Sequence, residues 1–230
     1  MPSRRDNQRV DAEPRARPIG LRRFAIALGA AAAAGAVLGL GAHLLFSDTA
    51  TPARPALPEL HGQATWPAGK RPAPRFVLRD VLGGTKSLAS LPGRVTLITF
   101  LDSQCHSLCP IVGRSIGDLQ REFPRTARPA LLIVSVDPAG DRPASVRKAA
   151  RKWRLVPGWH WLTGSHRQLA AVWHAYGIVV KPTTNDIVHG AALYLVDSQG
   201  FERAGYLPPL LPNFVALDIR HVEGRTASSG

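Results

Sequence analysis

Two continuous apolar segments, separated by an amphipathic one, dominate the middle of the chain. Residues 95–101 (VTLITFL) and 130–136 (ALLIVSV) are rich in β-branched side chains and apolar at nearly every position, which is typical of strands buried on both faces. Between them, residues 110–123 begin with a proline, which suits the first position of a helix, and place four apolar side chains on one helical face: Val112, Ile116, Leu119 and Phe123. The pattern predicts a strand–helix–strand unit with a right-handed crossover.

The segments around this unit continue the alternation of strands and helices. Residues 75–93 alternate around Gly83 and Gly84, which predicts a short hairpin. Further along, the patterns predict helices over 144–154 and 166–176, a strand pair within 191–207 that turns at 197–200, and a closing helix over 213–222. Strand, helix, strand, helix, hairpin and helix is the order of the thioredoxin fold, so the predicted fold class is α/β and thioredoxin-like.

A separate apolar segment near the amino terminus predicts a membrane anchor. Residues 24–46 are uncharged and long enough to cross a bilayer as a single transmembrane helix. The preceding residues 1–23 hold seven arginines against three acidic residues, and this positive excess keeps the tail in the cytoplasm. We therefore expect a single-pass membrane protein whose carboxyl-terminal domain lies on the extracytoplasmic, periplasmic side. A cleaved secretory signal is the alternative.

Composition divides the remainder of the chain. Residues 47–74 are rich in Pro and Ala without an apolar period, which predicts an extended linker. Residues 75–222 contain the predicted strands and helices and form the globular domain, and residues 223–230 are expected to be a disordered tail. With 45% hydrophobic residues, the chain can build a core without disulfides, so its two cysteines are not a structural framework.

The formal net charge of +13 at pH 7 comes mostly from arginine. Such a surplus attracts acidic proteins, nucleic acids or anionic lipids, although a composition rich in Arg, Ala, Pro and Gly is also what a GC-rich genome produces. The globular part contains no run of Lys and Arg interleaved with aromatic residues, so we do not expect a nucleic-acid partner.

The only two cysteines, Cys105 and Cys109, lie in the segment TFLDSQCHSLCP, where the first buried strand leads into the helix. Backbone N–H groups are unpaired at the start of a helix, and the helix dipole favours an anion there, such as a thiolate. We place Cys109 at the cap position, just before Pro110, and expect its thiol to have a depressed pKa, with Cys105 one turn earlier in the loop.

Three functions suit two thiols at this spacing. The first is dithiol redox catalysis, but such enzymes use Cys-x-x-Cys. The second is metal binding, because the additional residue here loosens disulfide geometry and leaves room for a metal ion between the sulfurs. A structural disulfide is the third possibility, but a bridge that closes so short a loop stabilises little. Thiolates select Cu(I) or Zn, and an imidazole as third ligand suits copper, whereas it leaves zinc one ligand short. The histidines that compete for this third position are His106, His160, His166, His174 and His189.

Four segments resemble, in order, parts of one known family. They are residues 99–110, 135–143 (SVDPAGDRP), 161–164 (WLTG) and 186–200 (DIVHGAALYLVDSQG), and together they are similar to the SCO/SenC proteins. Those proteins are membrane-anchored copper chaperones of thioredoxin fold that help to assemble the binuclear copper centre of cytochrome c oxidase. The resemblance covers about residues 76–222. It implies that this chain binds copper, as Cu(I), Cu(II) or both, through Cys105, Cys109 and His189.

The resemblance also implies two partners, a copper-accepting subunit of cytochrome c oxidase and a thiol-reducing protein. Asp137 and Asp141 match an acidic pair of the family, whose role would be either to support the metal ligands or to stabilise the structure. The chain departs from the family pattern at Ser103, where Thr is common, and between the cysteines, which enclose His106, Ser107 and Leu108. The competing functions are a thiol-disulfide oxidoreductase acting on the same or other exported proteins, and a copper sensor without an oxidase partner.

Overall fold

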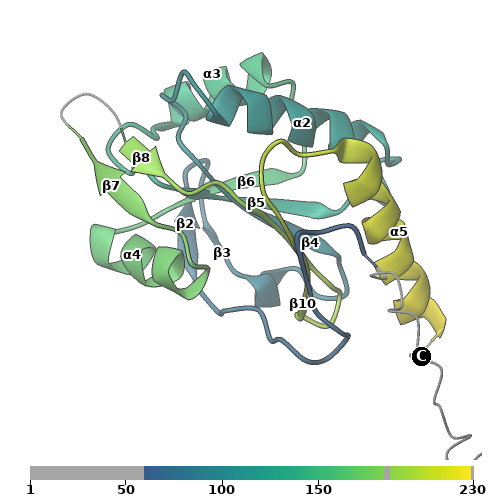
Figure 1. The fold of residues 1–230 in the computed structure, drawn as a ribbon. Helices are drawn as coiled ribbons and strands as arrows, with labels where there is room; N and C mark the ends of the chain where they lie inside the picture. The colour runs from purple at the N-terminus through teal and green to yellow at the C-terminus, as the bar shows by residue number, and fades with distance from the viewer. Residues whose placement is uncertain (1–59, 184–186, 229–230) are drawn as a thin grey trace, which may run out of the picture. The chain divides into compact units, whose positions relative to one another are not determined.

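A mixed eight-stranded β-sheet forms the centre of the domain, in the strand order β1-β10-β9-β4-β5-β6-β2-β3 (Figure 1). The structure, a computed structural model, describes residues 60–183 and 187–228. In chain order its elements are β1 (Ala64–Thr65), β2 (Leu78–Asp80), β3 (Thr85–Lys86), the 3-10 helix η1 (Leu88–Ser90), β4 (Thr96–Leu101), α2 (Cys109–Arg121), β5 (Ala130–Ser135), α3 (Pro143–Lys152), β6 (Trp159–Thr163), α4 (His166–Ala175), β7 (Val180–Pro182), β8 (Ile187–His189), β9 (Leu193–Val196), β10 (Glu202–Tyr206) and α5 (Pro212–Ser228).

The central strands β4 and β5 pair in parallel and are buried along their whole length. Their register runs from Thr96 opposite Ala130 to Leu101 opposite Ser135. Because successive side chains of a strand point to opposite faces, strands that are apolar at nearly every position need cover on both sides of the sheet. β6 extends the parallel part beyond β5, and β9 pairs antiparallel with β4 on the other side. The predicted strand–helix–strand unit is confirmed.

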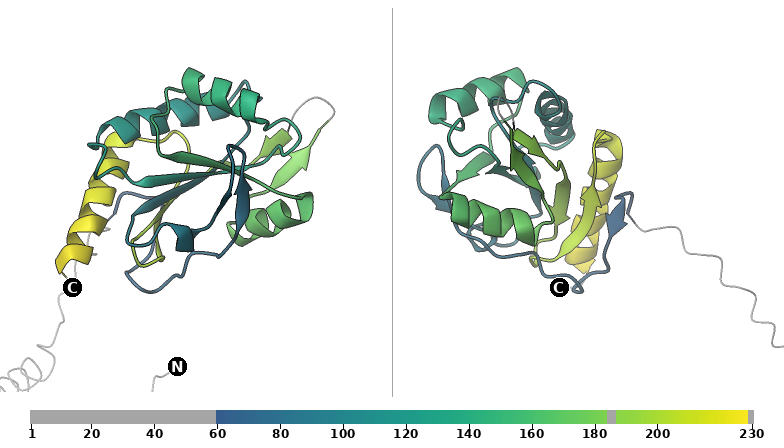
Figure 2. Two further views of the ribbon diagram at one scale, coloured as in Figure 1. Left: turned by 180° about the vertical axis from the view of Figure 1, so that it is seen from behind. Right: turned by 60° about the vertical axis from the view of Figure 1, so that its left-hand side comes forward.

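Helices cover both faces of this sheet (Figures 1 and 2). α2, α3 and α5 pack on one face, where their apolar side chains meet those of Leu97 and Leu131. α4 packs on the other face, against Ile98 and Leu132. Each fully buried side chain of this kind contributes about 1.5–3 kcal/mol relative to leaving it exposed. The result is the predicted thioredoxin-like α/β arrangement.

α2 and α3 lie close together because two glycines of α2 face α3. A β-carbon at Gly113 would lie 2.5 Å from the indole ring of Trp153, and one at Gly117 would lie 2.7 Å from the Trp153 backbone oxygen. The Trp153 side chain is fully buried, with its ring centroid 5.7 Å from that of Trp161. The absence of a side chain at these two glycines therefore sets the distance between the helices.

Several short strands were not predicted. β6 contains two tryptophans and a histidine in five residues, so it shows neither clean alternation nor a continuous aliphatic run. The hairpin of β7 and β8 pairs only with itself, and each of its strands has three residues. Segments this short carry too few positions for a period to be read.

Residues 60–74 belong to the domain, although their composition predicted a linker. Leu60 is buried, and β1 pairs with β10 at the edge of the sheet. The N–H of Ala73 donates to the carbonyl of Gly200 at 2.9 Å. Main-chain hydrogen bonds and a buried leucine therefore attach this Pro- and Ala-rich segment to the domain. Its composition indicated neither the hydrogen bonds nor the burial.

The carboxyl-terminal boundary also differs from the prediction. α5 includes residues 223–228, for which a disordered tail was predicted. Within the part of the chain that the structure describes, no helix has both the length and the apolar character needed to cross a bilayer. The predicted cytoplasmic tail, residues 1–23, and the predicted anchor, residues 24–46, lie outside the described residues.

We predict that Gly113→Ala lowers the free energy of unfolding by about 1–3 kcal/mol, because the added methyl group overlaps the buried Trp153 ring. Gly224→Ala is the matched control. It lies on α5, where an added β-carbon meets no atom within 4 Å, and it should be neutral or stabilising by up to about 1 kcal/mol. Urea denaturation followed by tryptophan fluorescence measures both. A Gly113→Ala variant as stable as the wild type would show that the helices separate without cost.

Candidate metal centre

The loop between β4 and α2 places the two cysteines at the carboxyl edge of the parallel strands. At the end of β4, the Asp102 carboxylate accepts the N–H of Gln104 at 2.6 Å, which turns the chain. The N–H of Ser103 donates to the carboxylate of Asp141 at 2.8 Å and ties the loop to the segment after β5. Cys105, further along this loop, is partly exposed.

Cys109 is the first residue of α2, and its side chain lies in the core. The N-cap residue is Leu108, which has helical backbone angles and makes no side-chain cap bond. The Cys109 side chain is 1% exposed and belongs to the apolar cluster under α2, α3 and α5. The expected cap position is therefore wrong by one residue, and the thiol points into the protein.

His189 reaches the cysteines from the β7–β8 hairpin. It pairs with Val180 and stands just before the chain enters β9. Its Nδ1–H donates to the carbonyl of Gly190 at 2.9 Å, so the lone pair is on Nε2. Nε2 lies 3.4 Å from the Sγ of Cys109, although 80 positions separate the two residues in the sequence.

The Nε2–Sγ distance suits two ligands of one metal ion. Metal–sulfur bonds of about 2.3 Å and metal–nitrogen bonds of about 2.0 Å, at a tetrahedral angle, separate the ligand atoms by about 3.5 Å, close to this distance. Cys105 is hydrogen-bonded to the Cys109 thiol and, at 3.5 Å, to the Ser107 hydroxyl. In residues 60–183 and 187–228, however, no three Cys, His, Asp or Glu side chains converge closely enough to hold an ion. A three-ligand site would therefore need the side chains of Cys105, Cys109 and His189 to move closer together.

The two thiols differ in their affinity for a proton. Burial raises the pKa of Cys109 well above its usual range, and the neighbouring Cys105 and Asp102 add to this despite a hydrogen bond from the Asp102 backbone. Burial also acts to raise the pKa of Cys105, but hydrogen bonds with Ser107 and Cys109 together outweigh it and lower that pKa. The expected depressed pKa of Cys109 is therefore wrong. Its desolvation exceeds any benefit from the helix dipole.

The acidic pair after β5 organises the backbone around the cysteine loop. Besides Ser103, the Asp141 carboxylate accepts the indole N–H of Trp161 at 2.8 Å, and its side chain is almost fully buried. This burial raises the pKa of Asp141 to about 6, against the hydrogen bonds that it accepts. The carboxylate of Asp137 accepts the N–H of Gly140 at 3.0 Å within a turn. Asp141 thus fastens the cysteine loop to β6.

The other histidines considered for the site have different positions. His160 on β6 is hydrogen-bonded to Asp80 at 2.8 Å. His166 and His174 lie on α4, on the opposite face of the sheet from α2 (Figure 2). His106 is exposed in the cysteine loop itself. Only His189 contacts a cysteine through a hydrogen bond that the described part of the chain shows.

Sequence reasoning missed the groups that adjust these side chains. The carbonyl of Gly190 orients His189, the hydroxyl of Ser107 lowers the pKa of Cys105, and the backbone of Asp102 bonds to Cys109. A main-chain group leaves no mark in the sequence. The closeness of Ser107 to Cys105 was the one available signal.

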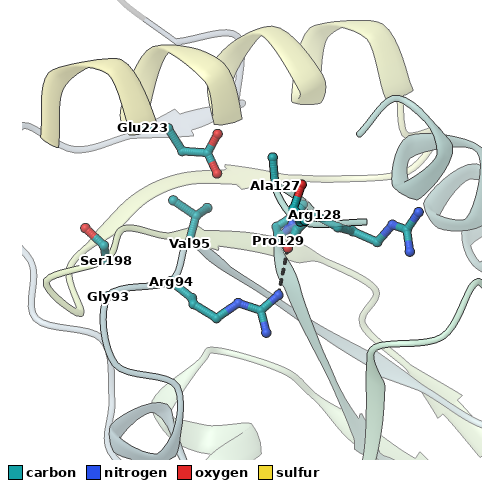
Figure 3. Close-up of a pocket in the computed structure, with 9 residues that line it drawn as sticks. Gly93, Arg94, Val95, Ala127, Arg128, Pro129, Ser198 and Glu223 are labelled. Carbon is teal, nitrogen blue, oxygen red and sulfur yellow. Dashed lines mark hydrogen bonds between the residues drawn. The ribbon is translucent and has the colours of Figure 1, made fainter. Parts of the chain in front are cut away.

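A cavity of about 280 Å³ lies at the other end of β4 (Figure 3). Its lining includes Arg94, Ser198 and Glu223, and Arg94 donates to the carbonyl of Arg128 at 2.8 Å. No thiol or imidazole lines this cavity. The soft-ligand chemistry of Cys105, Cys109 and His189 is therefore separate from it, at the opposite edge of the sheet.

A thioredoxin-like domain with a Cys-x-x-x-Cys loop and a histidine beside the second cysteine defines a class of proteins that use paired thiols for soft-metal binding or redox exchange. The sequence model of the family described as SCO1/SenC matches residues 66–222. The chain belongs to the SCO1/SenC family.

Individual relatives agree with this assignment. The SCO1 protein homolog of Bacillus subtilis (strain 168) is 32% identical over 131 residues, which are 54% of this chain and 68% of the relative. The structure of Bradyrhizobium japonicum ScoI with copper bound has a TM-score of 0.57 and 28% identity, and the match covers 65% of this chain and 98% of that one. BsSco, described as a member of the Sco family of cytochrome c oxidase assembly proteins, shares the fold with a TM-score of 0.60 at 24% identity, over 70% and 98% of the two chains.

We predict that iodoacetamide modifies Cys105 at least about tenfold faster than Cys109 in the metal-free, reduced protein at pH 7.5. Cys105 is partly exposed with a lowered pKa, whereas Cys109 is buried with a raised one. Mass spectrometry of the cysteine-containing peptides, from Cys105→Ser and Cys109→Ser variants, gives the two rates. Ser107→Ala should slow the labelling of Cys105, because it removes a hydrogen bond that lowers this pKa. Faster labelling of Cys109 would contradict the assignment.

A second prediction concerns pH and Asp141. Because the pKa of Asp141 is raised from 3.8 to about 6 in the folded state, its contribution to stability is fully present below pH 4 and is lost as the pH rises through 6. Asp141→Asn removes this titration. The stability of the variant relative to wild type should therefore increase by up to about 3 kcal/mol between pH 4 and pH 7. Urea midpoints measured across this range test it, and parallel curves for the two proteins would contradict it.

Proposed function

We propose that this chain is a copper chaperone that holds one copper ion through Cys105, Cys109 and His189 and delivers it to the binuclear copper centre of cytochrome c oxidase. The observation that carries this proposal is the 3.4 Å contact between Nε2 of His189 and Sγ of Cys109. Two elements far apart in sequence bring these atoms to the spacing of co-ligands, and the free thiol of Cys105 belongs to the same loop as Cys109.

The donor set favours copper over other metals. Two thiolates and one imidazole suit Cu(I), and the same three ligands can also hold Cu(II). A structural zinc site, by contrast, takes four ligands. The three proposed ligands include no oxygen donor, so the site offers little to hard cations. The copper-bound structure of Bradyrhizobium japonicum ScoI supports the same choice.

Delivery by ligand exchange follows from the chemistry of the thiols. Exchange needs reduced sulfurs, and oxidation of the pair to a disulfide would release the ion, so a thiol-reducing protein is the expected second partner. The description of BsSco as a member of a family of cytochrome c oxidase assembly proteins supports an oxidase subunit as the acceptor. The apolar residues 24–46 support a membrane anchor, with the domain on the extracytoplasmic side.

A thiol-disulfide oxidoreductase is the second candidate, and one observation favours it. The first cysteine is partly exposed with a lowered pKa and the second is buried with a raised one, which is the division between an attacking and a resolving thiol. The wider Cys-x-x-x-Cys spacing and the adjacent imidazole favour metal binding instead.

Anaerobic copper titration of the reduced full chain in neutral detergent tests the proposal. We expect one copper ion per chain and, with Cu(II), an intense sulfur-to-copper absorption. Cys105→Ala, Cys109→Ala and His189→Ala should each abolish or shift this absorption, because each removes a ligand. His174→Ala, an exposed histidine on α4, is the matched control and should bind as wild type does.

A disulfide-reduction assay on the same variants separates the two candidates. Insulin reduction that survives His189→Ala, together with unchanged copper binding, would favour the oxidoreductase. If His189→Ala loses the bound copper and the wild type does not reduce insulin, the result would favour the chaperone. Wild-type copper binding by His189→Ala would exclude this histidine as a ligand.

A further inference from the structure

The surface charge of the domain is concentrated on one helix. α3 carries four basic residues, its N-cap and the second residue beyond its end add two more, none of these positions is acidic, and all six side chains are exposed. We call them the α3 basic face: Arg142, Arg147, Lys148, Arg151, Lys152 and Arg154. The other helices are close to neutral by comparison, since α2 has two arginines and one aspartate, α4 has one arginine, and α5 has two basic and two acidic residues.

The charges of the α3 basic face are not compensated within the domain. Six carboxylates elsewhere are buried, and the ion pairs that the described residues form involve none of the six basic side chains. Arg147 with Arg151, and Lys148 with Lys152, are like-charge pairs four residues apart on one helix, which destabilise it. A helix that accumulates such repulsion without an internal partner points to an external, negatively charged one.

The α3 basic face starts beside the cysteine loop. The hydroxyl of Ser145, in the first turn of α3, lies 3.1 Å from the hydroxyl of Ser103 and donates to the carbonyl of Gly140 at 2.7 Å. α3 also packs along α2, the helix that begins with Cys109, through the close contact at Gly113 (Figures 1 and 2). A partner that binds along α3 would therefore lie near the cysteine loop.

The side chains of α3 favour a protein surface over a bilayer. A helix that lies in a membrane inserts its apolar face, but the apolar residues Val146, Ala149 and Ala150 are buried in this domain. Exposed apolar side chains occur instead beside Cys109, at Leu108 and Ile111. A basic surface next to a small apolar contact resembles the rim and core of a protein–protein interface.

Resting on the proposed function, we infer that the α3 basic face is the docking site for an acidic surface of the protein that accepts the copper. Electrostatic attraction raises the rate of association and orients the partner, while the metal passes through the adjacent thiols. The inference concerns the encounter, and it leaves copper affinity unchanged because none of the six residues is a proposed ligand.

The test compares two variants of equal net charge in the full chain. The docking variant is Arg147→Gln, Lys148→Gln, Arg151→Gln and Lys152→Gln. The control is Arg75→Gln, Arg79→Gln, Arg125→Gln and Arg167→Gln, four exposed arginines on other elements. The probe is the purified, reduced, copper-free copper-accepting domain of the oxidase subunit. Stopped-flow fluorescence gives its association rate, and absorption gives the rate and extent of copper transfer, in phosphatidylcholine and phosphatidylglycerol nanodiscs.

We expect association of the docking variant to be at least about tenfold slower at low ionic strength in both kinds of disc, with less than about twofold loss for the control. Its salt dependence should nearly vanish, and unchanged melting and copper spectra would confirm that it folds. Equal slowing of both variants would assign the effect to net charge and overturn the inference, as would slowing confined to phosphatidylglycerol discs or no slowing at all. Association that depends on α3 without any copper transfer would instead refute the proposed delivery and keep the docking site.

Discussion

The pairing of β4 with β9 is the constraint on which the site depends. The two strands run antiparallel, with Thr99 opposite Leu193, so the start of β9 lies at the end of β4. The residues before β9 therefore arrive where the loop after β4 begins, and the hydroxyl of Thr99 secures this end by donating to the carbonyl of Ala192 at 2.9 Å. This is why His189 lies beside Cys109 although the sequence between them includes three helices and several strands. A shift of register between these strands would separate the two side chains.

The strands and the helix that follow from a local hydrophobic pattern could be predicted from the sequence. The features that depend on contacts between distant residues could not. The runs that became β4 and β5 and the apolar face of α2 are long enough for their periods to be read. The side chain of Cys109 is different, since moving it from the N-cap to the first helical position turns it into the core and reverses the direction of its pKa shift. Residues 60–74 likewise depend on pairing with β10, a long-range contact that composition cannot express. The role of His189 came from the resemblance to a family, because a single histidine before a strand carries no chemical signature of its own.

The two thiols differ in exposure and in pKa, and this difference affects both candidate functions. A thiol must lose its proton to bind a metal, so the raised pKa of Cys109 opposes the loading of copper and couples it to proton release. Cys105 has no such barrier and stands at the surface, where an incoming ion or a disulfide meets it first. The imidazole of His189 then has two possible roles, because its Nε2 can accept a hydrogen bond from the Cys109 thiol across the 3.4 Å contact or serve as a metal ligand. An oxidoreductase needs only the first of these roles, whereas a chaperone needs the second.

A copper carrier must hold its ion firmly against loss to solvent and yet release it to one partner. In the proposed chaperone, burial of Cys109 and its contact with His189 would favour retention, since competing small thiols do not reach a ligand in the core. In the proposed chaperone, release would begin at Cys105, the proposed ligand that is partly exposed, and it would require an acceptor thiol close to that sulfur. Affinity between the proteins cannot come from the bonds between copper and the carrier, because these bonds break during transfer. Contacts outside the site must supply it, and the unpaired positive charge on α3, fastened to the cysteine loop through Ser145 and Ser103, is placed to do so without altering how tightly the metal is bound.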